Sequence, residues 1–228
     1  MKFAARLLAS GVDPGFTAPG PAFTAMLPED VLGRRVVACP VENVETAGRW
    51  WRDAPVHAKL AEAKREAVPA VVYPNLDAFL GILDDAGVPA GSWVQLSDPV
   101  VFEVEARCFM LYGIPVTASV YLDHGETWDS FSAPRDASWA VDAARRVGAA
   151  VTHQPRAYTL DVGRFRDGRV VVVEANPAWS SAPYHCGLGR VAEVVMAGQG
   201  DPLSVWRWRP DPSILTLRYP LQRRSVAG

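Results

Sequence analysis

The sequence predicts an α+β fold made mainly of antiparallel sheet, and two observations carry this prediction. Apolar and polar residues alternate with period two through most of residues 93–122, with a break at Tyr112-Gly113, which is typical of half-buried strands joined by a turn. Asp167-Gly168 marks a second strand return, between two segments with helical spacing. A chain of 228 residues, 49% of them hydrophobic, can bury a core as one large domain or as two packed lobes.

The first half of the chain predicts three short strands and one helix. Residues 1–45 are rich in proline and glycine, and among them only residues 36–39 have the composition of a strand. Residues 56–60 and 70–73 predict two more strands, with Lys64 in the loop between them. Asn75 is suited to cap a helix that Gly87 would end. The apolar residues of this helix follow helical spacing: Leu76, Phe79, Leu80 and Leu83.

The second half predicts longer strands and two more helices. Strands are expected at residues 93–99, 100–111 and 116–122, and helices at residues 136–150 and 188–197. The first of these helices is expected to bury Trp139, Val141, Ala144, Val147 and Val151. In the long strand, one face carries Glu103, Glu105 and Arg107, and the other carries Phe102, Val104, Ala106 and Cys108. The charged face is either a solvent-exposed, salt-bridged surface or a functional one.

The hairpin around Asp167-Gly168 gathers three oxygen ligands. If these two residues form a type I′ turn, Arg166 pairs with Arg169, and counting outward places Asp161 directly opposite Glu174. Asn176 lies two residues further along, on the same face as Glu174. Facing carboxylates repel each other, so the arrangement predicts a divalent cation, and carboxylate and amide oxygens suit Mg²⁺.

Composition excludes several classes of protein. The three cysteines, Cys39, Cys108 and Cys186, are odd in number and widely spaced, so neither a disulfide framework nor a zinc site is expected, and a reduced cytoplasmic protein is favoured. A charge inside the first apolar segment and the lack of an 18-residue apolar run argue against export and against a membrane span. The net charge of -2 makes nucleic acid an unlikely partner for the chain as a whole.

Two groups of basic residues leave alternatives open. Lysine occurs only at Lys2, Lys59 and Lys64, and the last two are close enough in sequence to act together as point charges on a phosphate; the alternative is that both are solvated surface charges. The C-terminal segment is basic and aromatic. It is either a tail that faces phosphate or nucleic acid, or one that its tryptophans pack onto the protein while its arginines stay solvated.

Several motifs together resemble a known family. Asp161 followed by Glu174-Ala175-Asn176-Pro177 resembles the metal-binding end of the ATP-grasp ligases, and Glu105-Ala106-Arg107-Cys108-Phe109 resembles their Glu-x-Arg-x-Phe strand. The order of motifs is similar to that of the R2K clade of this family. The matching segments are Lys59 and Lys64, Ser97-Asp98-Pro99-Val100, Glu105-Ala106-Arg107, Asp161-Val162-Gly163, and Glu174-Ala175-Asn176-Pro177-Ala178-Trp179.

The resemblance implies an ATP-grasp fold, in which two α+β lobes clamp a nucleotide. It implies that Lys59 and Lys64 contact the phosphates of ATP, and that Arg107 faces the terminal phosphate, with Arg107 and Lys64 as the catalytic residues. The strand that links the lobes would read the adenine edge through main-chain groups of Gln95, Leu96 and Ser97. Glu105 completes the nucleotide-binding set. The residues implied to hold Mg²⁺ are Asp161, Glu174 and Asn176.

The implied activity is that of an ATP- and Mg²⁺-dependent carboxylate-amine ligase that forms an acyl phosphate, with a peptide or an amino acid among its substrates. The expected organisation is a short N-terminal region (1–48), a small nucleotide-clamping lobe (49–96), a catalytic lobe with the metal site (97–200) and a basic aromatic tail (201–228). Residues 65–69 lack the glycines of a mobile phosphate loop, and the N-terminal region is short. A non-catalytic ATP-binding module of the same fold is therefore the alternative.

Overall fold

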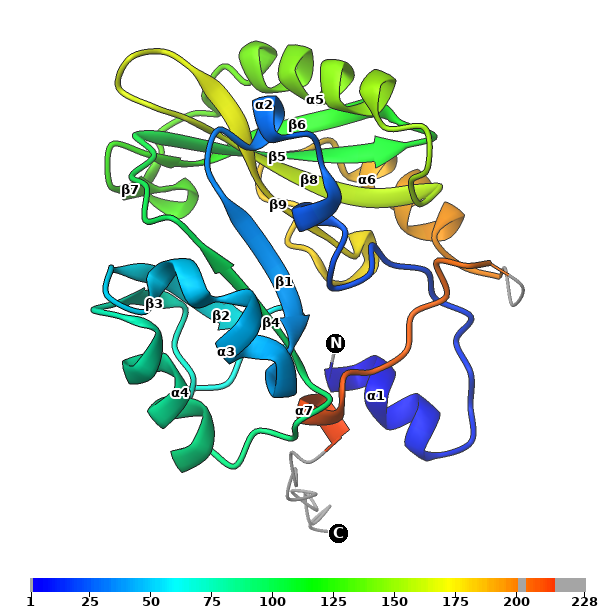
Figure 1. Ribbon diagram of the computed structural model, residues 1–228. Helices are drawn as coiled ribbons and strands as arrows, with labels where there is room; N and C mark the ends of the chain where they lie inside the picture. The colour runs from blue at the N-terminus through cyan, green and yellow to red at the C-terminus, as the bar shows by residue number, and fades with distance from the viewer. Residues whose placement is uncertain (1, 201–203, 216–228) are drawn as a thin grey trace, which may run out of the picture.

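The computed structural model describes residues 2–200 and 204–215 and consists of two lobes, each built on one antiparallel sheet (Figure 1). The small lobe has four strands in the order β1-β4-β2-β3, and the large lobe has five in the order β7-β6-β5-β8-β9. The strands of the small lobe are β1 (Val36–Pro40), β2 (Val56–Leu60), β3 (Val71–Tyr73) and β4 (Trp93–Ser97). Those of the large lobe are β5 (Val104–Leu111), β6 (Ile114–Asp123), β7 (Glu126–Thr127), β8 (Ala157–Arg164) and β9 (Val170–Asn176). The predicted α+β class is confirmed.

The small lobe packs α3 (Val44–Ala47) and α4 (Leu76–Asp85) against one face of its sheet. The cap at Asn75 is confirmed, because its Oδ1 accepts a hydrogen bond of 2.9 Å from the main-chain N–H of Ala78. Gly87 follows the helix with a φ of +58°, as expected for its end. This core includes Val56, Ala58, Leu60, Leu76, Phe79, Leu83, Val94 and Leu96. The other face of the sheet is left to carry polar side chains toward the large lobe.

The boundary expected at residue 49 differs from the structure. β1 pairs with β4 from Val36↔Ser97 to Pro40↔Trp93, so β1 and α3 belong to the small lobe rather than to a separate N-terminal region. The edge of β4 that β2 leaves open would otherwise expose its main-chain groups, and β1 supplies their partners.

The large lobe is covered by α5 (Ser138–Ala150) on one face of its sheet (Figure 1). Its core contains the residues predicted for the inner face of β5, namely Val104, Ala106 and Cys108, together with Ala140, Ala143, Ala144 and Val147 of α5. Val141 lies at the margin of this contact, and Ala140 and Ala143 take its place in the core. Small side chains allow the helix to approach the sheet closely.

Two predicted boundaries in this lobe were wrong. The long strand begins at Val104 and not at residue 100; residues 98–103 connect the lobes, and Val101 is 83% exposed. Pro99 has no N–H to give to a strand ladder. The helix begins at Ser138, because the carboxylate of Asp136 accepts the N–H of Ser138 at 3.0 Å and so holds a turn before the helix.

The hairpin of β8 and β9 confirms the predicted pairing of Asp161 with Glu174, although the predicted turn was wrong. Phe165 pairs with Arg169 through an N–H···O bond of 2.9 Å, which leaves a three-residue loop and shifts the register by one residue. A β-bulge then shifts it back, because Val162 pairs with Val172 while Asp161 pairs with Glu174. Val173 is the extra residue of the bulge.

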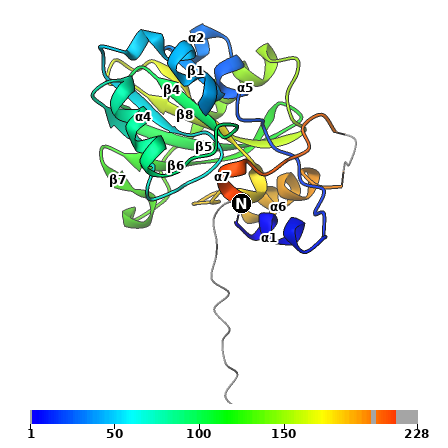
Figure 2. The same ribbon diagram turned by 60° about the horizontal axis from the view of Figure 1, so that its bottom comes forward.

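The two ends of the described chain lie together at one side of the lobes. A bridge joins Thr17 to Arg207, and α1 (Lys2–Ala9) contacts α7 (Pro212–Leu215) (Figure 2). Trp208 is only 6% exposed, so the described part of the C-terminal segment is packed by its tryptophans. Arg218, Arg223 and Arg224 lie outside the described residues. The remaining helices are α2 (Glu29–Leu32) and α6 (Leu188–Ala197).

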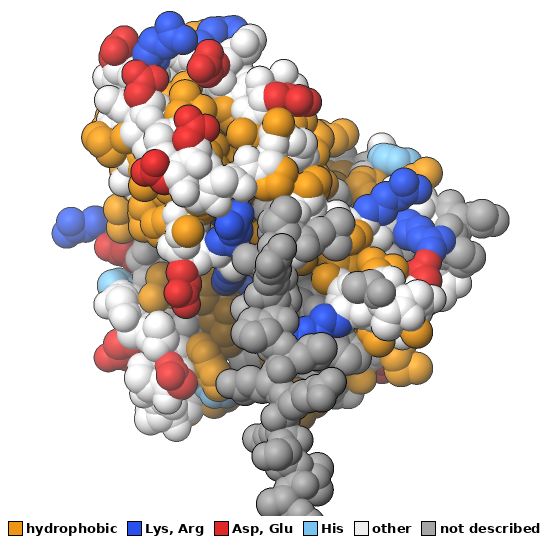
Figure 3. All heavy atoms as spheres, turned by 90° about the horizontal axis from the view of Figure 1, so that it is seen from below, with side chains coloured by type: hydrophobic (Ala, Val, Ile, Leu, Met, Phe, Trp, Pro, Cys, Tyr) orange, Lys and Arg blue, Asp and Glu red, His pale blue; other side chains and the backbone are white. Residues whose placement is uncertain are grey.

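The described part of the chain carries charges of both signs at its surface (Figure 3), and its cysteines are not joined in disulfides. Acidic and basic side chains are interspersed on the face that Figure 3 shows. All three cysteines are buried and free. Within the described residues, no helix has both the length and the apolarity needed to cross a membrane.

Candidate active site between the lobes

A row of charged side chains crosses the large sheet on the face opposite α5. Arg107 of β5 pairs directly with Asp161 of β8, and Asp161 pairs with Glu174 of β9. Because directly paired residues point to the same face, the strand registers alone bring the three side chains together. Lys59 of β2 in the small lobe contacts Glu174. The row therefore has a basic side chain at each end and two carboxylates in the middle.

Arg107 and Asp161 form a buried, two-pronged ion pair. The Nε and Nη2 atoms of Arg107 donate to the two carboxylate oxygens of Asp161 at 2.8 and 2.7 Å. Asp161 is 1% exposed, and its burial raises its pKa against the opposing effect of Arg107. Both oxygens of Asp161 are therefore engaged, and this carboxylate fixes the orientation of the guanidinium.

Glu174 lies where the two lobes meet. Its carboxylate accepts hydrogen bonds from the ammonium of Lys59 and, at 2.7 Å, from the Nδ2 of Asn176. Burial alone would raise the pKa of Glu174, but Lys59, Asn176 and Arg107 outweigh it and lower the pKa to about 2. Glu174 is thus an anion held by a lysine, on the same face as the amide of Asn176, as the sequence predicts.

Arg34 holds the bulge that sets this register. Its Nη1 donates to the carbonyl oxygens of Val172 at 2.7 Å and of Leu32 at 3.1 Å, and its Nη2 donates to that of Val173 at 2.9 Å. The side chain is buried, and burial lowers its pKa, an effect opposed by nearby carboxylates that include Glu174. Arg34 thereby joins the segment before β1 to the residues that precede Glu174.

Two tyrosine rings, those of Tyr121 and Tyr184, border the guanidinium of Arg107. The Arg107 Cζ lies 5.8 Å from the ring centre of Tyr121 and 5.1 Å from that of Tyr184, and the two rings stack. The hydroxyl of Tyr121 donates to Glu105, whose pKa is raised by burial. Tyr184 has a φ of +49°, an unfavourable conformation for a bulky residue that the surrounding contacts maintain.

The face of the small sheet that turns toward the large lobe carries the polar residues of β2 and β4. Lys59 pairs with Gln95, and His57 pairs with Ser97, so these four side chains share one face. Leu96 points the other way, into the core of the small lobe. β4 is a central strand, paired on one side with β1 and on the other with β2, so its main-chain groups are engaged in two ladders. This pairing argues against reading of adenine by the main chain of Gln95, Leu96 and Ser97.

Lys64 is not brought to this site. It lies exposed on the loop between β2 and β3, and no hydrogen bond or ion pair joins it to a site residue in the part of the chain that the structure describes. Lys59 and Lys64 are close in sequence, but only Lys59 faces the large lobe.

The donor atoms fit Mg²⁺, while the space around them is narrow. The described residues contain no group of three or more His, Cys, Asp or Glu side chains placed to hold a metal ion by themselves. Glu174 and Asn176 offer oxygen atoms, and Mg²⁺ commonly takes one or two carboxylates together with substrate phosphates and water. The space beside the contact of Lys59 with Glu174, which we call the inner pocket, measures only about 10 Å³, which is too small for a nucleotide in this conformation.

A larger space adjoins the inner pocket, and we call it the outer cavity. It measures about 630 Å³. Its wall is made by the N-terminal segment, the loop after β2 and the C-terminal segment: Ala18, Pro19, Gly20, Pro21, Glu62 and residues 204–209. Pro19, Gly20, Pro21 and Glu62 also line the inner pocket, so the two spaces share a wall.

Sequence reasoning missed several residues of the site. Two of them, Thr24 and Arg34, lie in the N-terminal segment, whose sequence is notable mainly for its proline and glycine content. The hydroxyl of Thr24 accepts a hydrogen bond of 3.1 Å from the N–H of Ala175. Tyr121 was hidden in a strand pattern, where an aromatic residue is also a normal strand former. No local signal distinguishes Arg34 and Thr24, because each acts on a strand that is distant in sequence.

Comparison with known proteins gives one match over most of the chain. The model of a family described as "ATP-grasp domain, R2K clade family 2" matches residues 31–194, which is well over half of the sequence. No curated protein matches the chain.

Solved structures resemble the chain more weakly. A RimK domain ATP-grasp protein from Sphaerobacter thermophilus is 16% identical with a TM-score of 0.42, over 87% of this chain and 74% of its own. A D-alanine–D-alanine ligase from Bacillus anthracis is 12% identical with a TM-score of 0.47, over 86% and 74%. Cdc123 from Schizosaccharomyces pombe is 12% identical with a TM-score of 0.42, over 82% and 89%. Similarities of this size carry no argument about substrates.

Proposed function

The chain belongs to family 2 of the R2K clade of ATP-grasp domains, and from this premise we propose that it is an ATP- and Mg²⁺-dependent carboxylate-amine ligase. In the proposed reaction, a substrate carboxylate attacks the γ-phosphate of ATP to give an acyl phosphate, and an amine then displaces phosphate. The observation that supports it best is the row Arg107, Asp161 and Glu174 on the large sheet, faced by Lys59 of the small one. Two cations and two anions at a lobe interface suit a triphosphate with its metal ion.

In this proposal, the small lobe holds the nucleotide. Lys59 exchanges its contact with Glu174 for a phosphate when the lobes open, and Gln95 and Ser97 line the same face. Leu96 supports that face from the core. Lys64 contacts the phosphates only if its loop closes over them, so its proposed role depends on a movement.

The large lobe supplies the metal site and the reacting end. Glu174 and Asn176 would hold Mg²⁺, which neutralises charge on the phosphates when it is bound. Asp161, proposed as a third ligand, acts in this conformation by orienting Arg107. Arg107 stabilises the transferring phosphoryl group, and Glu105 lies beside it on the same face of β5. No protein nucleophile is needed, because phosphoryl transfer depends mainly on positioning and charge neutralisation.

The test is ADP release with pools of candidate carboxylates and amines. We expect substrate-stimulated release by the wild type and a loss of at least 100-fold in Glu174→Gln, because one carboxylate ligand of the ion is removed. The matched control is Glu193→Gln, an exposed carboxylate paired with Arg190 on α6, which should release ADP at the wild-type rate. Equal stimulated release from wild type and Glu174→Gln would remove the assigned metal role.

A second candidate is a non-catalytic ATP-binding module with a regulatory or structural role. The exposed position of Lys64 and the closed inner pocket favour it. Calorimetric titration with ATP and Mg²⁺ separates the two candidates. Binding without turnover over a broad substrate panel supports the module, turnover supports the ligase, and no binding removes both.

A further inference from the structure

The wall of the outer cavity is formed largely by two segments that are distant in sequence, residues 18–21 and residues 204–209. The N–H of Ala18 donates to the carbonyl of Trp206 at 2.9 Å, and the N–H of Trp208 donates to that of Phe16 at 2.8 Å. Asp211 joins the C-terminal segment to the small lobe, because its carboxylate accepts a hydrogen bond of 2.8 Å from the N–H of Trp93 in β4. The cavity therefore lies between two segments that are fixed to each other and to the small lobe.

The wall is also fixed to the metal-binding end of β9. Trp179 follows Asn176 by one turn, and its Nε1 donates to the carbonyl of Thr17 at 2.8 Å. Its ring stacks on Phe16 at 4.5 Å and meets the ring of Trp208 edge-on at 5.0 Å. The position of the cavity relative to Glu174 is thus set by an aromatic stack rather than by a free loop.

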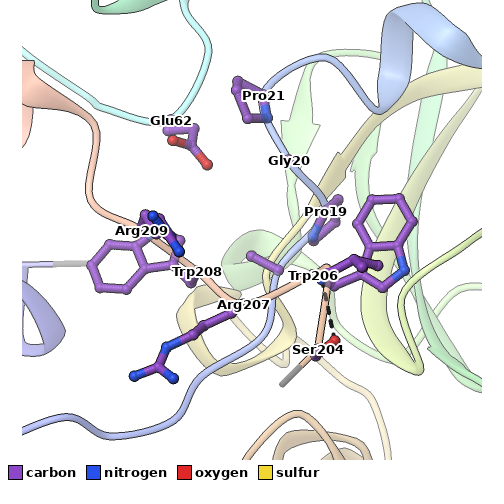
Figure 4. Close-up of a pocket in the computed structure, with 11 residues that line it drawn as sticks. Pro19, Gly20, Pro21, Glu62, Ser204, Trp206, Arg207, Trp208 and Arg209 are labelled. Atoms are coloured by element: carbon purple, nitrogen blue, oxygen red, sulfur yellow. Dashed lines mark hydrogen bonds between the residues drawn. The ribbon is translucent and has the colours of Figure 1, made fainter. Parts of the chain in front are cut away.

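One acidic and one basic side chain, Glu62 and Arg209, border the cavity. Glu62 projects from the loop after β2 toward the space that Trp208 and Arg209 border from the C-terminal segment (Figure 4). Arg207 also lines the cavity, but it points away from Glu62 and is paired with Asp13. Within the described part of the chain, no hydrogen bond or ion pair is recorded for the side chains of Glu62 and Arg209.

The positions of Glu62 and Arg209 determine how a ligand with two charged ends would be oriented in the cavity. Glu62 lines both the inner pocket and the outer cavity, whereas Arg209 lines only the outer cavity. A ligand with an ammonium group at Glu62 and a carboxylate at Arg209 would therefore point its amino group toward Lys59 and Glu174. Burial, and to a lesser extent Asp211, raises the pKa of Glu62 to about 8, as expected for a carboxyl group that lacks a cation.

We propose that the outer cavity binds the amine substrate, and that this substrate is a zwitterion, either an α-amino acid or a short peptide, with its ammonium group at Glu62 and its carboxylate at Arg209. This inference rests on the proposed ligase function and adds to it the class of amine and the site that holds it. About 630 Å³ lies within the usual range of roughly 300–1,000 Å³ for small-molecule sites. Trp206 and Trp208 also line the cavity and offer apolar contact to the rest of the molecule.

The experiment measures binding rather than turnover. Wild-type protein is titrated calorimetrically with the twenty common amino acids and with glycine-containing dipeptides, with and without Mg²⁺ and a non-hydrolysable ATP analogue. The best ligand is then compared with its analogue that lacks the amino group and with its analogue that lacks the carboxylate. We expect each analogue to bind at least 10-fold more weakly than the zwitterion.

Two variants assign each half of the ligand to a side chain. Glu62→Gln should lower affinity for the zwitterion about 10-fold while leaving the analogue without the amino group unchanged. Arg209→Gln should lower affinity several-fold while leaving the analogue without the carboxylate unchanged. The controls are Glu66→Gln, an exposed carboxylate in the same loop, and Arg146→Gln, an exposed residue of α5, and both should bind like the wild type.

Each result decides between specific statements. If no zwitterion binds while ATP still does, the inference is overturned and the ligase proposal stands. Zwitterion binding that neither Glu62→Gln nor Arg209→Gln changes overturns the assigned site. Absence of ATP binding removes the ligase proposal, whatever the amino acids do.

Discussion

The Nη2 of Arg34 donates a hydrogen bond of 2.9 Å to the carbonyl of Val173, the extra residue in the bulge of β9. This contact bridges 139 positions of sequence and holds the bulge that returns Glu174 to a position opposite Asp161. Without the bulge, the three-residue hairpin loop would offset the two carboxylates by one residue and send Glu174 to the other face of the sheet.

Removal of Arg34 should therefore destabilise the fold and the site together. Arg34→Met leaves three carbonyls, two of them in buried hydrogen bonds, without this donor, and we expect a loss of about 3 kcal/mol in the free energy of unfolding, measured by urea denaturation. Arg34→Lys should recover part of this loss, since one ammonium cannot span the same carbonyls as a planar fork. Arg35→Gln, an exposed neighbour stacked on Trp50, should change stability by less than about 1 kcal/mol. A loss for Arg34→Met no larger than that for Arg35→Gln would contradict this role.

The ion pair of Arg107 and Asp161 should show the asymmetry of a buried charge. Arg107→Met leaves the Asp161 carboxylate buried without its partner, and we expect a loss of about 3–5 kcal/mol in the free energy of unfolding. The double variant with Asp161→Leu removes both charges and should be more stable than Arg107→Met alone. As a control, Arg190→Met breaks an exposed pair with Glu193 and should cost less than about 1 kcal/mol. A double variant less stable than Arg107→Met alone would contradict this prediction, because it would show that the unpaired carboxylate of Asp161 does not cause the loss.

Gly163 of the Asp-Val-Gly motif is expected to tolerate no side chain. A Cβ on this residue would come within 2.6 Å of the Cγ of Phe102, whose ring covers the strand at this point. Gly163→Ala should lower the free energy of unfolding by about 1–3 kcal/mol, measured by thermal and chemical denaturation. Gly189→Ala in α6 is the matched control, because nothing lies within 4 Å of its Cβ, and it should leave stability unchanged or raise it by up to about 1 kcal/mol. Restored stability in Gly163→Ala combined with Phe102→Leu would confirm the cause.

Glu62 should give stability a specific pH dependence. Its folded pKa is raised from 4.5 to about 8, so between these values the folded protein keeps a proton that the unfolded chain releases. Its contribution to stability therefore falls as pH rises through this range. Glu62→Gln cannot lose the proton, and its unfolding temperature should match that of the wild type near pH 4 and exceed it increasingly up to pH 9. The exposed control Glu66→Gln should stay close to the wild type throughout, and a constant difference for Glu62→Gln would contradict the prediction.

Prediction from sequence succeeded where a pattern is local to one strand or helix. Alternation placed Arg107 and Glu105 on the face opposite Val104 and Ala106, and Asn75 caps its helix as expected. The hairpin shows a different outcome, since the pairing of Asp161 with Glu174 was confirmed while the turn behind it was wrong. The longer loop shifts the register by one residue and the bulge shifts it back, so the two errors cancelled. No local sequence pattern predicts a bulge at Val173.

The sequence by itself determined which strands exist, which of their faces carries charge, and the order of motifs that identifies the family. These follow from the fixed geometry of a strand, in which successive side chains alternate between faces. Tertiary structure alone decided that Lys59 contacts Glu174 across the lobes, that Lys64 lies outside the site and that Arg34 holds the bulge. It also decided that residues 18–21 and 204–209 enclose a cavity beside Glu62. Each of these depends on how distant segments pack, and the free energy of packing belongs to pairs of segments and not to either segment alone.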